Sequence, residues 1–414
     1  MIRLRSVIII GFVALCAVTS VSGAVPESFP IRPGDRIALV GNTFVDQLRM
    51  HGYLETLLLQ RSEGKPVSIL NLGWAGDMLT ARDRPTGFPT EESELTAHKT
   101  DILIACFGMG ESFMGEAGVP GFRRDLEHFI DSHKGKQYNG KTEVRLILIS
   151  PIAYEDLGEL TPAWEKRNHE LTAYTRVMSQ VAIKAGLPVV NLNQATADLM
   201  QYDSAPKLTS NGVNLNDYGY WCVSRTLADA LMAGPLPWQL SIDVPSLKVS
   251  GHGVNISEIR RDGVGVTFRV QERTWPSAGA PVEGQVHREL NGNLDQLIVT
   301  GLNVGQYSLS VDGEELLTAS HLELTEGVAI DSSPTHLALE KYREAIYDKN
   351  LQFLYSWKAL NQVHIVGERR KSASGRALPG EVLEFKTLAD QKDEALSTGI
   401  ELRTREWRLT PAEL

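Results

Sequence analysis

The stretch "RIALVGNTFVD", residues 36–46, contains the turn that decides the fold. Residues 37–40 are apolar enough for a buried β-strand, and Gly41 permits a tight turn after them. Two small polar residues, Asn42 and Thr43, follow at the turn, and a helical pattern begins after them. A strand, a turn and a helix in this order are typical of a parallel sheet, in which turn side chains lie at the carboxyl end of the strand. The stretch therefore predicts that Asn42 and Thr43 present polar groups at that edge.

The same alternation of strand and helix continues to about residue 234. Short apolar strands separated by amphipathic helices predict an α/β fold with a parallel sheet covered on both faces. Such a domain is expected over residues 30–235. The predicted strands are residues 36–40, 66–73, 101–108, 143–151 and 188–192, and the predicted helices are residues 44–61, 118–133, 161–186 and 216–234.

The second half of the chain changes character. Residues 241–325 are rich in Val and Gly in short alternating runs, and "VDGE" at 311–314 is a hairpin signal. This pattern predicts a small antiparallel β-unit. Residues 334–414 return to a largely helical pattern, and we expect this segment to pack back on the α/β domain.

Charge and the amino-terminal residues limit the partners and the location. The net charge of −10, with no basic patch, argues against nucleic acid as a partner. Residues 1–24 combine Arg3 and Arg5, a short apolar run and small residues, which is typical of a signal peptide. That run is shorter than the ~20 residues of a membrane-spanning helix. We therefore expect an exported protein, periplasmic or extracellular, without a stable membrane span; an uncleaved anchor is the alternative.

Cysteine and histidine patterns give no indication of a metal or a cofactor. Cys106 and Cys222 remain after removal of the signal peptide, and both fall in apolar runs, so two buried free thiols are expected. The sequence contains no C-x-x-C, H-E-x-x-H or C-x-x-C-H motif. We expect neither a metal nor a cofactor.

Four blocks stand at the predicted strand ends: "GDRIALVGNTF" at 34–44, "NLGWAGDML" at 71–79, "ACFGMGES" at 105–112 and "SNGVNLNDYGYW" at 210–221. In order and spacing they resemble those of the SGNH (GDSL-like) ester hydrolases. The resemblance implies a flavodoxin-like three-layer sandwich and a Ser–His–Asp site. The stretches at 299–316 and 342–370 look like a long-form secreted bacterial branch in which Gly-Asn-Thr replaces Gly-Asp-Ser.

The resemblance places the family's catalytic positions on residues that mostly lack the required chemistry. The nucleophile falls on Thr43, and the Gly of the oxyanion hole is kept as Gly76. The Asn of the oxyanion hole falls on Gly110. The triad Asp and His fall on Asn211 and Asn214, and an amide cannot accept a proton near neutral pH.

Three functional interpretations follow. The first is a degenerate ester-hydrolase site that retains a pocket for a carbohydrate or ester ligand. The second is an active carbohydrate esterase or deacetylase that uses Thr43 with another base. The third is a non-catalytic interaction module. The histidines available as a base lie on predicted helices or in the carboxyl-terminal part: His51, His128, His133, His169, His252 and His364.

Two further groups of residues are candidates for ligand contacts. Asp77 and Glu111 could form a polar pocket and perform acid–base work, or Asp77 could cap a helix while Glu111 is solvated. Aromatic and polar residues of the carboxyl-terminal segment suit carbohydrate stacking, with helix packing as the alternative. These residues are Tyr355, Trp357, Asn361, Arg369 and Arg370.

Overall fold

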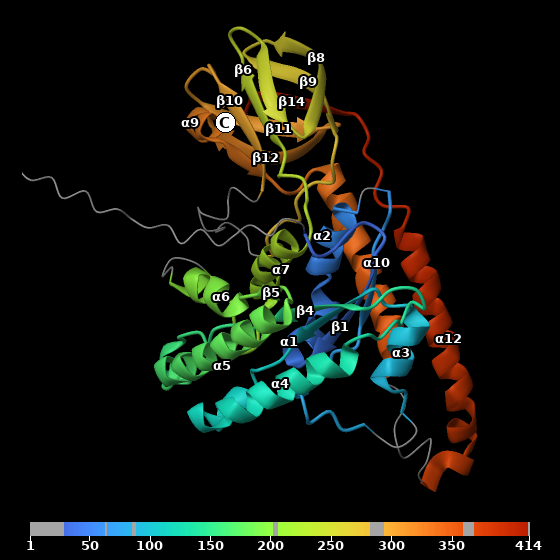
Figure 1. The fold of residues 1–414 in the computed structure, drawn as a ribbon. Helices are drawn as coiled ribbons and strands as arrows, with labels where there is room; N and C mark the ends of the chain where they lie inside the picture. Colours follow the sequence, from blue (N-terminus) through green and yellow to red (C-terminus); the bar gives the residue numbers. More distant parts are fainter. Residues whose placement is uncertain are drawn as a thin grey trace, which may run out of the picture.

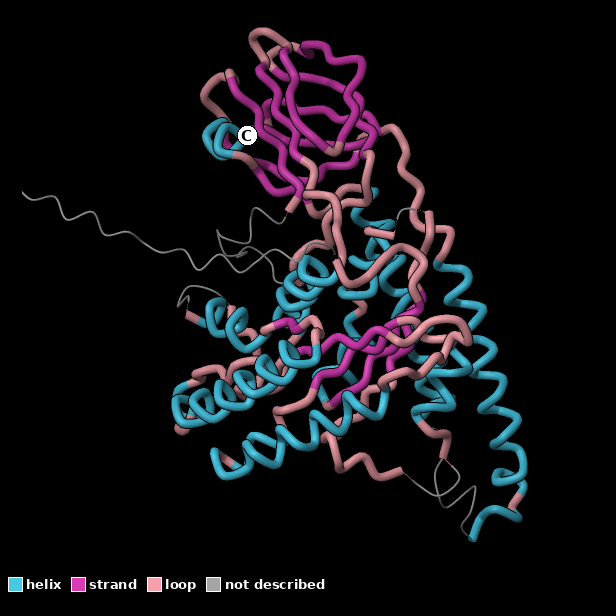
Figure 2. Tube along the Cα trace, in the orientation of Figure 1, coloured by secondary structure: helices cyan, strands magenta, loops and turns pink. Residues whose placement is uncertain are grey.

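The computed structural model describes residues 29–62, 64–84, 88–201, 206–281, 294–358 and 368–412. Its strands gather in two places, a central sheet surrounded by helices and a β-sandwich at one end (Figure 2). The predicted signal peptide, residues 1–24, lies outside the described residues. No helix in the described ranges combines the length and the apolar character needed to cross a membrane.

The central sheet confirms the predicted parallel α/β domain. Its five strands run in the order β2-β1-β3-β4-β5, and all neighbouring pairs are parallel. The register pairs Gly41 with Cys106, so the ends of β1 and β3 meet at one edge. The strands are β1 (Arg36–Gly41), β2 (Ser68–Asn71), β3 (Ile102–Cys106), β4 (Arg145–Ile149) and β5 (Val189–Val190).

Alternate residues of β1 pack into the two helical layers. Ile37 and Leu39 belong to the cluster that includes α1, α2, α6 and α7. Ala38 and Val40 belong to the cluster that includes α3, α4 and α5. This alternation gives the three-layer arrangement (Figure 1). The helices are α1 (Thr43–His51), α2 (Tyr53–Gln60), α3 (Glu91–His98), α4 (Val119–His133), α5 (Trp164–Ala185), α6 (Leu192–Met200) and α7 (Asp217–Leu231), with short 3₁₀ turns η1 (Glu111–Met114), η2 (Glu116–Gly118) and η3 (Gly158–Leu160).

The single helix predicted over residues 44–61 is divided in two. Gly52 has a left-handed conformation, with φ 69°, and its N–H bonds to the carbonyl of Leu48. This geometry ends α1, and α2 begins at the next residue. The hydrophobic pattern continued through the break because both helices face the same layer.

The β-sandwich consists of a four-stranded and a five-stranded sheet, ordered β13-β10-β6-β7 and β12-β11-β14-β9-β8. All pairings are antiparallel except that of β6 with β10. The last strand, β14, comes from the end of the chain and lies between β9 and β11. The elements are β6 (Gln239–Asp243), β7 (Lys248–His252), β8 (Val254–Asp262), β9 (Gly265–Glu272), β10 (Asp295–Thr300), β11 (Gln306–Val311), β12 (Glu314–Ser320), α9 (His321–Glu326), β13 (Val328–Ile330) and β14 (Arg405–Pro411).

Two long helices, α10 (Pro334–Trp357) and α12 (Ala373–Leu396), lie side by side along the edge of the central sheet (Figure 1), and η4 (Glu368–Lys371) precedes α12. The buried Lys349 of α10 forms an ion pair with Glu55 of α2 and a second one, at 3.5 Å, with Asp393 of α12. Lys349 also donates to the carbonyl of Ile69 in β2 at 3.0 Å. The helices therefore cover the edge strand β2, which would otherwise be open to pairing.

Candidate functional site

A cavity of about 210 Å³ lies at the carboxyl ends of β1, β3 and β4. This is the edge at which ligands bind in open α/β sheets. The cavity brings together Thr43, Gly76, Gly110 and Asn214, which come from four separate loops. Its lining residues are Asn42, Thr43, Phe44, Gly76, Asp77, Cys106, Met109, Gly110, Phe113, Pro151, Ile152, Val213, Asn214, Leu215 and Tyr220.

The turn after β1 explains why Asn42 precedes Thr43. Gly41 has φ 152°, and a Cβ there would lie 2.4 Å from the carbonyl oxygen of Cys106. The Oδ1 atom of Asn42 accepts a hydrogen bond from the N–H of Phe44 at 3.1 Å and caps α1. Thr43 is the first residue of α1, so its N–H has no acceptor inside the helix. The Thr43 hydroxyl makes no hydrogen bond with another described residue.

The loop after β2 brings Gly76 and Asp77 to the cavity. Arg84 donates to both oxygens of the Asp77 carboxylate, at 3.0 and 2.6 Å. The Arg84 guanidinium also lies over the ring of Trp74, 4.3 Å from its centroid. The charge of Asp77 is therefore compensated within its own loop, and Asp77 caps no helix.

Glu111 joins two loops below the cavity and does not line it. Its Oε1 accepts from the N–H of Leu79, and its Oε2 accepts from the N–H of Gly108, both at 2.8 Å. Burial raises the pKa of Glu111, while these two donors act in the opposite direction. Its oxygens are thus engaged in fixing the loops after β2 and β3.

Met78 occupies the space beside Gly110. The backbone of Gly110 is ordinary, with φ −64° and ψ −46°, so any residue could adopt it. A Cβ at this position would lie 2.7 Å from Cγ and 3.0 Å from Sδ of Met78. The apolar thioether therefore fills the region where a side-chain donor at position 110 would project.

The loop before α7 places Asn214 at the cavity and turns Asn211 onto its own backbone. The Oδ1 atom of Asn211 accepts from the N–H groups of Val213, at 3.2 Å, and Asn214, at 2.8 Å. Buried Glu155 holds the start of this loop, because it accepts from the N–H of Leu208 and from both the N–H and the hydroxyl of Thr209. The role of Glu155 is not evident from the sequence, in which the only signal is an acidic residue shortly after the buried strand β4.

The cavity combines apolar walls with neutral polar groups. Two of its polar side chains, those of Thr43 and Asn214, make no hydrogen bond among the described residues. Asn42 caps α1, and Asp77 pairs with Arg84. Cys106 lines the cavity as a buried free thiol, and burial raises the pKa of that thiol well above its usual value. Tyr220 donates its hydroxyl to the carbonyl of Phe44 at 3.1 Å. Such a surface suits an uncharged ligand.

No histidine of the described ranges lines the cavity. His51 stacks on Tyr220, with ring centroids 4.2 Å apart, and its Nδ1 lies 2.7 Å from Asp217. His133 contacts Tyr138, and His252 lies near the carbonyl of Pro237. His364 is outside the described residues.

A Ser–His–Asp chain does exist elsewhere in the molecule. Ser333 Oγ lies 2.7 Å from His336 Nδ1, and His336 Nε2 lies 3.1 Å from Asp295. Ser333 caps α10, and Asp295 also accepts from the N–H groups of Trp238 and Ser277. The side chains of His336 and Asp295 are each only 1% exposed. These three hydrogen-bonded side chains therefore join α10 to the sandwich, and they are too deeply buried for a substrate to reach them.

The carboxyl-terminal residues considered for carbohydrate contacts lie in several environments. Trp357 is buried against Trp74 and Phe88, with centroid distances of 6.2 and 4.9 Å. Tyr355 packs against Phe385 at 5.1 Å. Arg369 and Arg370 are exposed in η4, and Asn361 is outside the described residues.

The end of α10 reaches the loops that form the cavity. Lys358 pairs with Asp46 of α1 at 2.6 Å and lies 4.7 Å from the ring centroid of Trp74. The helix end therefore helps to hold the loops that carry Thr43 and Gly76.

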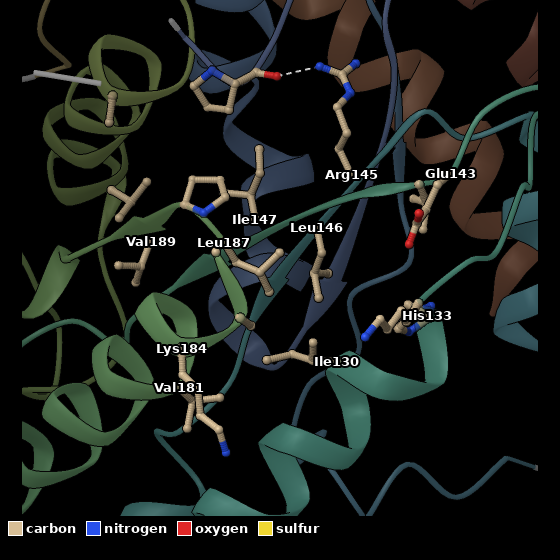
Figure 3. A pocket seen from close by; sticks show the side chains of 18 of the residues that line it. Ile130, His133, Glu143, Arg145, Leu146, Ile147, Val181, Lys184, Leu187 and Val189 are labelled. Carbon is tan, nitrogen blue, oxygen red and sulfur yellow. Dashed lines mark hydrogen bonds between the residues drawn. The ribbon is translucent and has the colours of Figure 1, made fainter. Parts of the chain in front are cut away.

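A larger cavity, of about 1430 Å³, lies at the opposite end of the sheet (Figure 3). Aliphatic side chains such as Leu146, Ile147 and Val189 line it, and Arg145 donates to the carbonyl of Pro30. It adjoins the amino ends of β4 and β5, away from the loops that carry Thr43 and Asn214. The smaller cavity is therefore the candidate site.

Comparison with known proteins identifies the fold. No family model and no curated protein matches the sequence. The solved structure of BT4096, a gut microbial diltiazem-metabolizing enzyme, matches with TM-score 0.69 and 17% identity, over 93% of this chain and 99% of that one. A catalytic mutant of Axe2, an acetylxylan esterase from Geobacillus stearothermophilus, matches with TM-score 0.40 and 16% identity, over 49% of this chain and 96% of that one. The chain therefore shares its fold with BT4096 over nearly its whole length.

Proposed function

We propose that the chain is an exported protein of the SGNH (GDSL-like) hydrolase type that binds a small uncharged ester without hydrolysing it. One observation carries the proposal. The cavity at the nucleophile turn offers neutral polar groups, and its one carboxylate, Asp77, is paired with Arg84. The Thr43 hydroxyl makes no hydrogen bond to a base among the described residues.

The missing proton acceptor argues against turnover. A hydroxyl attacks an ester only when a neighbouring base takes its proton. The position that the family resemblance assigns to that base is Asn214, whose amide cannot do so. Removing the His of a Ser–His–Asp triad costs roughly 10⁶-fold in kcat, because the triad acts as a unit. We therefore expect Thr43 to contact a ligand without attacking it.

The size and the polarity of the cavity favour an ester over a carbohydrate. A cavity of about 210 Å³ is somewhat larger than the ~150 Å³ engineered cavity that holds one benzene molecule. It therefore suits one carbonyl with a ring-sized group. A sugar carries a hydroxyl on nearly every carbon, and the two polar side chains without a hydrogen bond here, Thr43 and Asn214, would leave most of them unpaired. The N–H of Thr43, which has no acceptor inside α1, can donate to one ester carbonyl.

Export is the second part of the proposal and rests on residues 1–24, with their two arginines, apolar run and small residues before the expected cleavage position. Amino-terminal sequencing of the protein recovered from the periplasm or medium tests it. We expect the mature chain to begin near Ala24.

Ligand-observed NMR with phenyl acetate tests the binding proposal. We expect saturable binding to the wild type, and loss of binding in Asn214→Trp, in which an indole at an exposed lining position blocks the cavity. Asn303→Trp places the same ring on an exposed loop of the sandwich and should bind like the wild type. Equal binding by all three proteins would show that the ester binds elsewhere, and would refute the proposal.

A further inference from the structure

We infer that Phe113 is a specificity-determining residue that selects esters carrying an aromatic ring; this inference rests on the proposed function. Phe113 belongs to η1, lines the cavity and is 65% exposed. Exposed apolar side chains are common on protein surfaces. Phe113 differs from most because its ring is held in one orientation at a cavity mouth.

The orientation is fixed by Arg167 of α5. The Arg167 guanidinium carbon lies over the Phe113 ring, 4.1 Å from its centroid. Arg167 also donates to the carbonyl of Ser112 at 3.2 Å and to its hydroxyl at 2.8 Å, and pairs with Glu170. These contacts with Ser112 and Glu170 hold the guanidinium over the ring, while its Nε is buried without a hydrogen-bond partner in the described structure.

The backbone around Phe113 is held just as firmly. Ser112 is fully buried, and its hydroxyl donates to the carbonyl of Met109 at 2.7 Å. Tyr174 of α5 donates to the carbonyl of Gly115 at 2.9 Å. The ring is therefore presented from a rigid 3₁₀ turn, and a ligand that contacts it loses little freedom in the protein.

Only one face of the ring remains for a ligand. Arg167 covers the other face, so the exposed area belongs to the free face and the edge. Aromatic rings attract one another in offset-stacked or edge-to-face arrangements beyond their apolar area, an effect of roughly two- to tenfold in affinity. A saturated ring of similar size receives only the area term. The geometry therefore points to an aryl ester, with its carbonyl at Thr43 and its ring against Phe113.

Paired probes test the inference. Phenyl acetate and cyclohexyl acetate share the acetyl group and differ in the flatness of the ring. Dissociation constants for both are measured by NMR titration with the wild type and with Phe113→Leu, Phe113→Tyr and Met114→Leu. Met114 is the matched control, because it is the next residue, is 71% exposed and does not line the cavity.

We expect Phe113→Leu to weaken phenyl acetate roughly two- to tenfold. Cyclohexyl acetate should change by less than about twofold, since a leucine keeps the apolar contact. Phe113→Tyr keeps the aromatic face and should restore the preference, and Met114→Leu should leave both constants unchanged. Equal changes for the two esters, or no change for either, would overturn the inference while leaving the proposed function intact. Failure of both esters to bind the wild type would overturn the proposed function, and this inference with it.

Discussion

If the cavity is a hydrolase site that has lost its proton relay, restoring the relay should restore turnover. The substitutions are Thr43→Ser, Gly110→Asn, Asn211→Asp and Asn214→His, and the structure adds a fifth. A Cβ at position 110 would lie 2.7 Å from Met78 Cγ, so Met78→Ala is needed to make room for the amide. The clash involves only side-chain atoms of Met78, so removing them should leave the loop backbone in place.

The expected gain is large. The relay contributes roughly 10⁶-fold in a complete triad, and one oxyanion-hole donor contributes about 10²–10³-fold. An imperfectly placed relay should recover only part of this gain, because a triad acts as a unit and misalignment is costly. We expect at least about 10³-fold over the wild type. Hydrolysis of p-nitrophenyl acetate, corrected for the buffer rate, measures it.

Two matched variants separate the contributions. The same set without Met78→Ala should recover less activity, because the thioether still occupies the donor's space. The set without Asn214→His should gain no more than the added oxyanion-hole donor supplies, because it lacks a base. A five-substitution variant that keeps the wild-type circular dichroism spectrum and binds phenyl acetate, yet hydrolyses no faster than the wild type, would refute the reasoning.

Three further predictions concern the stability of the fold around the site. Lys349→Met should lower the free energy of unfolding by about 3–5 kcal/mol, because Glu55 is left buried without its cation. Urea denaturation measures this loss of stability, and a loss below about 1 kcal/mol would contradict the prediction. Burial lowers the pKa of His133 from 6.5 to about 4, so only the unfolded chain binds this proton between those values, and stability should fall by up to about 3 kcal/mol as the pH drops through this range. His133→Gln should remove that part of the pH dependence, and an unchanged slope of stability against pH would exclude His133 as its source. Gly41→Ala should prevent accumulation of folded protein, because the added Cβ would lie 2.4 Å from the carbonyl oxygen of Cys106 in β3. Gly305→Ala is the control, because Gly305 also has a positive φ but has nothing within 4 Å of an added Cβ. Equal folding of the two variants would argue against the turn geometry.

The sequence was sufficient to predict the central sheet and the location of the candidate site. Strand-to-helix switches repeat along residues 36–234, and Gly41 marks a turn at a sheet edge. These are local patterns, so a single segment reveals them. The break at Gly52 was hidden because both helices bury the same face.

Side-chain contacts that depend on how loops fold and how elements pack together could not be predicted. The sequence predicted Asp77 as a candidate acid or a helix cap. Its ion pair with Arg84 depends on how the intervening loop folds. Nothing in the sequence indicates that Met78 fills the space beside Gly110, or that β14 joins the sandwich between β9 and β11. Such contacts are set by packing between elements and leave no periodic signal.

One NMR sample tests the central claim most directly, because it reports binding and turnover together. Wild-type protein is incubated with phenyl acetate, and saturation transfer to the ester and the appearance of acetate are followed beside a buffer blank and Asn214→Trp. We predict saturation transfer with the wild type, none with Asn214→Trp, and release of acetate at the buffer rate in every sample. Release of acetate above the buffer rate by the wild type, abolished by Thr43→Ala, would contradict the claim that this cavity binds an ester without hydrolysing it.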